Sequence, residues 1–262
     1  MDHFSINFTI LNNTEIPETL IMNARDYHLI RECRSLTTNT RSDNIVVERM
    51  MITIAGACCS GKSFLADSIA KLSKASVLHL DDYSIPRSVR LTSRSYLDVE
   101  NHDIPAGYDH DSALEAIAKW RAGITAEVPI YEFAKSEIKG MRSLKPTRIL
   151  VVEGLFTLHD ARFRNAALLK IYVSTSLDLM LGRRIVGSIH FQSIEDSILK
   201  HIRTVVPGHQ QFVEPSRQYA DMIVDLGYEP SAPHLVNETI TEKTARIIVK
   251  MIADENQDDA TE

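Results

Sequence analysis

The segment that most constrains the fold is residues 50–73, where an apolar run leads through a glycine-containing loop into an amphipathic stretch. The run Met50–Ala55 is apolar almost without interruption, which is typical of a strand covered on both faces. The stretch from Lys62 to Ser73 repeats apolar residues at helical spacing, namely Phe64, Leu65, Ile69 and Leu72. A buried strand that leads directly into a helix indicates a parallel α/β sheet.

The rest of the chain continues this alternation. Four further runs predict strands, at Val77–Leu80, Arg148–Val152, Leu169–Val173 and Asp221–Asp225. An amphipathic helix is expected over Asp111–Ala122. We therefore predict an α/β fold with a doubly wound, mostly parallel five-stranded sheet, carried by one domain over residues 50–253.

Residues 1–49 have a different pattern and a role that the sequence leaves unknown. Alternation over Phe4–Ile10 predicts a strand, the spacing of apolar residues over Leu20–Ile30 predicts a helix, and the polar stretch Thr37–Asp43 predicts a linker. We favour a small appended lobe or an extra edge strand over a separate regulatory module. Residues 254–262 are acidic and are expected to form a flexible tail.

Charge and composition narrow the functional classes. The formal net charge is −6, from 29 basic and 35 acidic residues, which disfavours a general nucleic-acid-binding face. Three cysteines, two of them adjacent, do not form a secreted disulfide framework. Neither a signal peptide nor a membrane span is recognisable, so we expect a cytoplasmic protein with no membrane or nucleic-acid partner.

The loop after the first strand of this domain carries a phosphate-binding motif. The residues Gly56, Ala57, Cys58, Cys59, Ser60, Gly61, Lys62 and Ser63 fit G-x-x-x-x-G-K-[ST]. In this motif backbone N–H groups and a helix N-terminus surround phosphates, the lysine reaches the β- and γ-phosphates, and the hydroxyl ligates Mg²⁺. We therefore predict ATP and Mg²⁺ as cofactors.

The adjacent cysteines inside this loop have two interpretations. Positions between the two glycines tolerate small residues, and Cys58 and Cys59 are small; we favour this interpretation. The alternative is a redox switch, because a thiolate close to backbone N–H groups has a depressed pKa.

Acidic residues follow two of the predicted strands. Asp81 and Asp82 come directly after Val77–Leu80, and Glu153 follows Val152. Ligands of open α/β sheets bind beyond the carboxyl ends of the strands, so these carboxylates are candidates for orienting an acceptor hydroxyl and for holding Mg²⁺. Helix capping is the alternative role. His79, within a strand, is interpreted as a core residue.

With these residues assembled, the chain from about Met50 to Gly227 resembles the uridine kinase/phosphoribulokinase family of P-loop kinases. The resemblance also rests on six other segments, at Asn101–Pro105, Pro129–Phe133, Val152–Leu155, Leu181–Ile185, Phe212–Ser216 and Tyr219–Ile223. It implies an ATP-dependent nucleoside kinase of nucleoside salvage that phosphorylates the 5′-hydroxyl of a ribonucleoside such as uridine or cytidine. It also implies a homo-oligomer.

The resemblance assigns roles by position. Asp81 corresponds to the catalytic base of the family. Ser63, Asp81 and Glu153 together correspond to its metal site. Asp103 falls on a ribose-hydroxyl ligand and Tyr131 on a residue of the nucleoside pocket. Arg184 falls on an arginine that contacts substrate and, with Lys62, is implied to be catalytic.

Two segments depart from the family pattern. The His and Arg that help to fix the pyrimidine are replaced by Ser136 and Ile138, and the lid arginines are replaced by Gly187–Gln192. Two alternatives therefore stay open. One is a kinase of the same fold for another hydroxylated acceptor, such as nicotinamide riboside; the other is a weakly catalytic nucleotide-binding relative.

Overall fold

The computed structural model describes residues 20–22, 49–86, 88–89, 101–227 and 238–253. Its main sheet has the strand order β1-β8-β7-β2-β6-β3. The strands are β1 (Leu20–Met22), β2 (Met50–Gly56), β3 (Ser76–His79), β6 (Ile149–Glu153), β7 (Leu169–Ser174) and β8 (Met222–Asp225). The pairs from β8 across to β3 are parallel, which confirms the predicted five-stranded parallel sheet.

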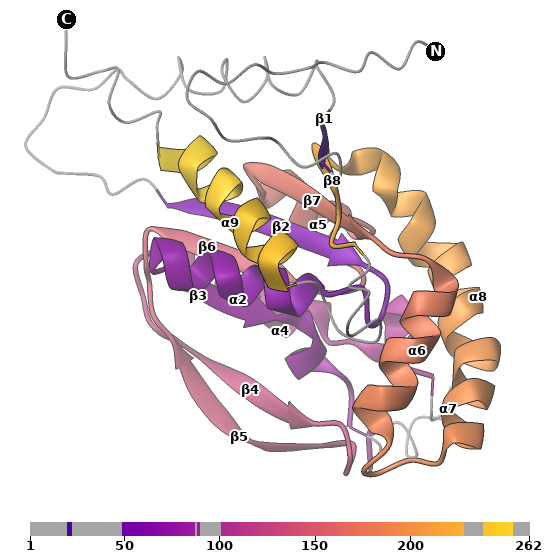
Figure 1. Ribbon diagram of the computed structural model, residues 1–262. Helices are drawn as coiled ribbons and strands as arrows, with labels where there is room; N and C mark the ends of the chain where they lie inside the picture. Colours follow the sequence, from indigo (N-terminus) through magenta and orange to yellow (C-terminus); the bar gives the residue numbers. More distant parts are fainter. Residues whose placement is uncertain (1–19, 23–48, 87, 90–100, 228–237, 254–262) are drawn as a thin grey trace, which may run out of the picture.

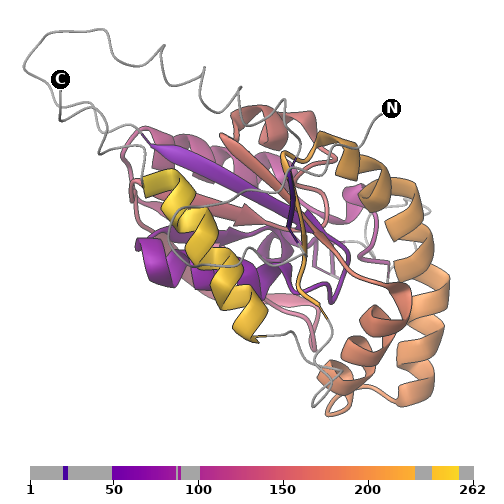
Figure 2. The same cartoon turned by 45° about the horizontal axis from the view of Figure 1, so that its top comes forward.

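Helices cover both faces of this sheet (Figures 1 and 2). On one face, α2 (Lys62–Ser73) and α9 (Glu238–Ala253) bury an apolar cluster with β2 that includes Ile52 and Ile54. On the other face, α4 (His110–Arg121) and α5 (Ala161–Ala166) pack with Met51 and the fully buried Trp120. Neighbouring residues of β2 thus enter opposite cores, which explains its uninterrupted apolar sequence.

A separate antiparallel hairpin lies beside the main sheet. It consists of β4 (Ala126–Glu132) and β5 (Glu137–Leu144), with a bulge between Ile130 and Tyr131. In Figure 1 the hairpin extends below the main sheet. The sequence pattern does not predict these strands, although Tyr131, a candidate site residue, lies within one of them.

A helical arm follows β7. It begins with α6 (Leu177–Ser188) and α7 (Ile194–Lys200), continues through two π-helical turns (His201–Val205 and His209–Val213) around α8 (Val206–Gly208), and ends in a 3₁₀ helix, Glu214–Tyr219. Figure 1 shows α6 and α7 side by side, to the right of the main sheet. The chain then returns to the sheet as β8.

The prediction of a helix over Leu20–Ile30 is wrong for Leu20–Met22, which form strand β1. These three residues pair antiparallel with Met222–Val224 of β8, so the unpaired edge of the sheet decides their conformation over local helical spacing. The strand predicted to reach Leu80 ends at His79, and Leu80–Tyr83 form a 3₁₀ turn. The predictions for Phe4–Ile10, Thr37–Asp43 and the acidic tail lie outside the described residues.

Candidate functional site

The phosphate-binding motif forms a tight loop between β2 and α2. The backbone N–H of Ser60 donates to the carbonyl of Ala57 over 3.1 Å. A Cβ atom on Gly56 would lie 2.7 Å from the Val173 carbonyl oxygen and 2.8 Å from Ser60 Oγ, so only glycine lets the loop pass this close to β7. The structure thus has the strand–loop–helix order that the motif requires.

Lys62, Ser63 and Glu153 meet where this loop enters α2. Ser63 Oγ donates to Glu153 Oε1 over 3.1 Å, and Lys62 Nζ lies 3.9 Å from Glu153 Oε2. Burial disfavours a charge on Glu153, but Lys62 and the hydrogen bonds from His79 and Ser63 outweigh it and lower its pKa. Burial likewise opposes the charge of Lys62, whose pKa is nevertheless raised by Asp81 and Glu153. This cluster therefore keeps a buried ammonium and a buried carboxylate side by side.

His79 belongs to the same cluster. Its Nδ1 lies 2.7 Å from Glu153 Oε1, and β3 pairs with β6 so that His79 is directly opposite Glu153. Burial disfavours the imidazolium, but the contact with Glu153 raises the pKa of His79. The interpretation of His79 as a core residue missed this role; the carboxylate at the end of the neighbouring strand was the available signal.

The two adjacent aspartates after β3 have separate positions. Asp81 is half-buried and feels the charge of Lys62, and its Oδ1 is shielded from solvent without a hydrogen-bond partner among the described residues. Burial raises the pKa of Asp81, and Lys62 opposes this only in part. Asp82 accepts from Tyr131 N over 3.1 Å and from Arg142 Nη2 over 3.3 Å. Asp82 therefore fixes the hairpin, and Asp81 is the carboxylate beside the loop.

Two consecutive arginines of α6 reach the phosphate-binding loop. Arg183 donates to the carbonyls of Cys59 (3.4 Å) and Ser60 (3.2 Å) and so supports the loop backbone. Arg184 Nη2 lies 2.9 Å from Cys58 Sγ. The predicted Arg184 is thus next to the predicted phosphate-binding residues.

Asp103 is held by the helical arm. It is buried, and its Oδ2 accepts from Thr204 Oγ1 over 3.0 Å. A Cβ atom on Gly208 would clash with the Asp103 carbonyl oxygen and lie 2.7 Å from Asp103 Cβ, so glycine is required for this close approach. His201, on the same arm, is also buried, with Nδ1 unpartnered among the described residues.

Tyr131 lies in a group of three aromatic rings with His102 and Phe133. The Tyr131 ring centroid is 6.3 Å from that of His102 and 5.0 Å from that of Phe133, both edge-on. Tyr131 is 6% exposed, and its hydroxyl has no partner among the described residues. Ser136 occupies the hairpin turn with a positive φ of 54°, and Ile138 is 46% exposed. His102 therefore brings an imidazole to Tyr131 from a different segment.

Tyr108 is a further residue near the candidate site that the sequence pattern does not indicate. It is buried among the predicted site residues, and burial together with the negative charges of Asp81 and Asp103 raises its pKa. No local signal in the sequence distinguishes Tyr108 from a core tyrosine.

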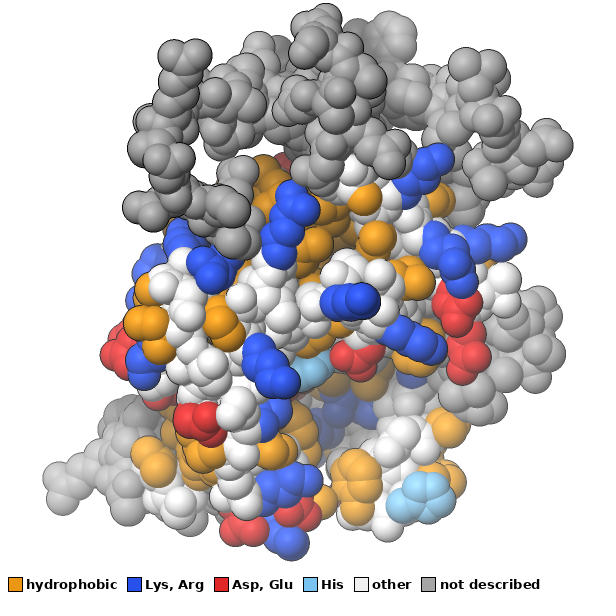
Figure 3. All heavy atoms as spheres, turned by 90° about the vertical axis from the view of Figure 1, so that its left-hand side faces the viewer, with side chains coloured by type: hydrophobic (Ala, Val, Ile, Leu, Met, Phe, Trp, Pro, Cys, Tyr) orange, Lys and Arg blue, Asp and Glu red, His pale blue; other side chains and the backbone are white. Residues whose placement is uncertain are grey.

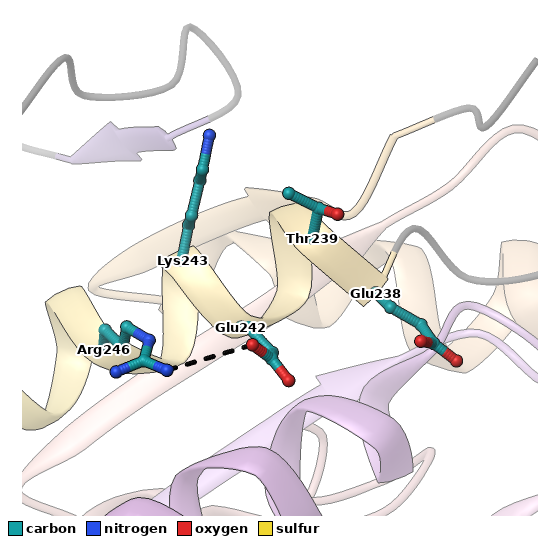
Figure 4. A pocket seen from close by; sticks show the side chains of 5 residues that line it. All are labelled: Glu238, Thr239, Glu242, Lys243 and Arg246. Carbon is teal, nitrogen blue, oxygen red and sulfur yellow. Dashed lines mark ion pairs between the residues drawn. The ribbon is translucent and has the colours of Figure 1, made fainter.

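The surface views add two observations. In Figure 3 the lower half of the face is hollowed, and basic side chains lie at the back of the hollow. A second, shallow hollow beside α9 is lined by Glu238, Thr239, Glu242, Lys243 and Arg246. Figure 4 shows Glu242 paired with Arg246, while Glu238, Thr239 and Lys243 point in other directions. All five residues belong to α9, which supplies none of the candidate site residues. Among the residues that the structure describes, no helix has the length and apolar character needed to cross a membrane.

Comparisons with known proteins agree with this geometry. The uridine kinase of Escherichia coli (strain K12) is 32% identical over 186 residues, covering 68% of this chain and 87% of the relative. The uridine kinase of Yersinia enterocolitica is 33% identical with the same coverage.

Solved structures share the fold at lower identity. A phosphoribulokinase from Rhodobacter spheroides has a TM-score of 0.51 at 14% identity, covering 72% of this chain and 75% of that chain. A D-glycerate 3-kinase from Cryptococcus neoformans has a TM-score of 0.52 at 12% identity, covering 74% and 90%. The model of the phosphoribulokinase/uridine kinase family matches residues 51–230. The chain therefore belongs to this family, and it is a phosphotransferase that acts on a hydroxyl group.

Proposed function

We propose that this protein is an ATP-dependent kinase that transfers the γ-phosphate to the 5′-hydroxyl of a ribonucleoside, with uridine, the acceptor that its relatives' names give, and cytidine, which the family resemblance implies, as the first candidates. One observation carries the proposal: the half-buried Asp81 keeps a solvent-shielded carboxylate oxygen unpartnered among the described residues, within the electrostatic reach of Lys62 at the loop Gly56–Ser63. A shielded carboxylate oxygen without a partner is costly for a fold and is therefore a candidate for function.

The residues present fit a magnesium nucleotide. Ser63, Glu153 and Asp81 offer only oxygen donors, which Mg²⁺ prefers, and no cluster of three His, Cys, Asp or Glu among the described residues forms a complete metal cage. Mg²⁺ usually binds through one or two carboxylates and completes its shell with water and phosphate oxygens. When bound, it neutralises phosphate charge and orients the transferred group. Lys62 would bind the β- and γ-phosphate oxygens from its buried position.

Asp81 would act on the acceptor. Its unpartnered oxygen would accept a hydrogen bond from the 5′-hydroxyl and take that proton as the new oxygen–phosphorus bond forms, while the bond from the γ-phosphorus to the β–γ bridging oxygen breaks and ADP leaves. Burial, which raises the pKa of Asp81, makes the carboxylate a better proton acceptor. Arg184, beside the loop, would stabilise the charge of the phosphoryl group in transit.

The acceptor would lie between the helical arm and the hairpin. Thr204 holds one oxygen of Asp103 and leaves the other for the ribose hydroxyls. The rings of His102, Tyr131 and Phe133 would stack on the base, and the unpartnered Tyr131 hydroxyl would hydrogen-bond to it. His102 would supply the imidazole that Ser136 cannot.

The substitution Asp81→Asn tests the role of the carboxylate. We expect acceptor-dependent ADP release to fall by at least about 100-fold, the lower end for a general base, while calorimetry still detects MgATP binding. Asp82→Asn is the matched control one residue away. Because Asp82 binds the hairpin, its kcat should stay within about tenfold of the wild type. Equal turnover of the wild type and Asp81→Asn would refute the assignment.

A second acceptor class is favoured by the hairpin. Ser136 and the half-exposed Ile138 stand where the family resemblance implies base-reading His and Arg. ADP release should therefore be compared for uridine, cytidine, nicotinamide riboside and small polyols. The proposal for pyrimidine ribonucleosides fails if uridine and cytidine are among the poorest acceptors. MgATP binding without turnover on any acceptor would identify a weakly catalytic relative. The cytoplasmic location and the homo-oligomer stay predictions.

A further inference from the structure

The phosphate-binding loop contains two thiols in contact. Cys58 Sγ and Cys59 Sγ lie 3.8 Å apart, both side chains are half-buried, and neither is bridged. Cys59 has a positive φ of 65°, a conformation rare for residues other than glycine. The loop therefore places two sulfur atoms next to each other, within reach of a small solute, at the predicted phosphate site.

The surroundings of the two thiols differ in charge. The hydrogen bond with Cys58 and the positive charges of Arg184 and Lys62 outweigh burial and lower the pKa of Cys59 to about 6. The hydrogen bond with Cys59 and burial raise the pKa of Cys58. These opposite directions favour Cys59 as the more readily deprotonated thiol of the pair. A reactive thiolate next to a second thiol is the arrangement from which peroxide-sensitive cysteines form disulfides.

We propose that Cys59 and Cys58 form a peroxide-reactive pair, in which oxidation to a reversible disulfide closes the phosphate-binding loop to nucleotide. The Cys59 thiolate attacks one oxygen of hydrogen peroxide, the O–O bond breaks, and the released hydroxide takes a proton from solvent to become water. Cys59 is then a sulfenic acid. Cys58 Sγ attacks Cys59 Sγ, the S–S bond forms, and the leaving hydroxide departs with the Cys58 proton as a second water. Two thiols are oxidised, and one peroxide is reduced to two waters.

The bridge would alter the loop in two ways. It joins neighbouring residues, whose Cα atoms are about 3.8 Å apart across a trans peptide, which is closer than an ordinary disulfide prefers. The backbone between Gly56 and Ser60 must therefore shift, and its N–H groups lose their convergence. Cys58 Sγ also ceases to be the partner of Arg184. Because strained disulfides are easily reduced, thiols reverse the change. The effect on nucleotide rests on the proposed function; the bridge itself does not.

Peptide mapping and calorimetry test this proposal on the full chain. Reduced protein is treated with hydrogen peroxide, alkylated and digested, and MgATP binding is measured before and after. We expect the peptide carrying Cys58 and Cys59 to lose two hydrogens and resist alkylation. We expect MgATP affinity to fall by at least about tenfold and to return with dithiothreitol. Cys33→Ala removes the third cysteine of the sequence and should behave as the wild type.

Single variants separate the two sulfur atoms. Cys58→Ala should give a sulfenic acid at Cys59 that dimedone traps, without a bridge. Cys59→Ala should give neither the sulfenic acid nor the bridge, and its MgATP affinity should be the same before and after peroxide treatment. If circular dichroism shows that Cys59→Ala misfolds, Cys59→Ser is used in its place. The proposal is overturned if both thiols of the wild type stay fully alkylatable after peroxide treatment. It is also overturned if peroxide lowers the MgATP affinity of Cys59→Ala as much as that of the wild type. If reduced protein does not bind MgATP at all, the proposed function fails, whereas the peptide map still decides the bridge.

Discussion

Thr204 acts on the candidate site through a single hydrogen bond. Its hydroxyl lies 3.0 Å from Asp103 Oδ2 and 2.9 Å from the carbonyl of Lys200, so it ties a buried carboxylate to the helical arm. Thr204→Val keeps the shape and removes the donor. We expect the KM for the acceptor to rise roughly fivefold, because one such bond contributes about 1 kcal/mol, with kcat nearly unchanged. Thr204→Ser should restore KM; an unchanged KM in Thr204→Val would show that Asp103 needs no support.

His110 makes stability depend on pH. Burial lowers the pKa of His110, and the neighbouring Asp160 opposes this only in part. As the pH falls through the usual imidazole value of 6.5, the unfolded chain takes up a proton that native His110 does not, so the free energy of unfolding decreases. Urea denaturation at several pH values should show that His110→Asn loses less stability than the wild type between about pH 7 and 5.

Two comparisons isolate this effect. His201 and His209 also have pKa values lowered by burial. Both residues are present in the wild type and in His110→Asn, so their contributions cancel when the two stability curves are subtracted. Asp160 titrates at a pKa of about 2, outside the window. His190→Asn, at an exposed position, should keep the wild-type profile. Parallel stability curves for His110→Asn and the wild type would contradict the prediction.

Residues of the candidate site differ in how far the sequence predicts them. Lys62 and Ser63 belong to a contiguous motif, and Asp81 and Glu153 follow strands, so local pattern and one rule of sheet architecture suffice. The contact of His79 with Glu153 depends on the register of two strands and joins residues 74 positions apart. The bond from Thr204 to Asp103 depends on how the helical arm docks. Such contacts are properties of packing rather than of local sequence.

Gly208 is where the helical arm meets the segment around Asp103. A Cβ atom there would lie 2.7 Å from Asp103 Cβ and closer still to the backbone, which cannot move aside cheaply. Gly208→Ala should therefore lower the free energy of unfolding by about 1–3 kcal/mol, the usual cost of overpacking, and raise the acceptor KM. Urea denaturation and steady-state kinetics measure both effects.

Gly182 provides the matched control for this substitution. It lies within α6, and an added Cβ atom meets nothing within 4 Å. Gly182→Ala should therefore stabilise the protein by about 0.5–1 kcal/mol through helix propensity alone. If Gly208→Ala is as stable as Gly182→Ala, the close approach at Asp103 does not constrain the arm.

The same distinction between local and non-local signals applies to elements. The five parallel strands are readable because burial on both faces makes their sequences continuously apolar. The hairpin strand β5 is largely exposed, so it lacks a hydrophobic pattern and was not predicted. The π-helical turns around α8 have no sequence signal that propensity captures. Local spacing predicts a helix where β1 forms, because the pairing of its three residues with a distant sheet edge decides their conformation.

At the scale of the whole molecule, the sheet has two unlike edges. The β3 edge lies beside the hairpin, because Asp82, three residues after β3, binds Tyr131 and Arg142. The other parallel edge, β8, is covered by β1, which pairs with Met222, Ile223 and Val224. An uncovered strand edge offers unpaired N–H and C=O groups to other chains. Strand β1, Leu20–Met22, therefore covers a sheet edge that is separate from the candidate site.

Deleting residues 1–48 should expose the β8 edge and cause concentration-dependent association beyond the state of the full chain, measured by sedimentation velocity. Deleting residues 1–19 keeps β1 and should leave the sedimentation profile unchanged. MgATP affinity should be the same in both, because β7 separates β8 from the strand that carries the phosphate-binding loop. If both truncations sediment like the full chain, β1 does not protect the edge. If the deletion of residues 1–48 weakens MgATP binding and the deletion of residues 1–19 does not, residues 20–48 support the phosphate-binding part of the fold and do more than cover the β8 edge.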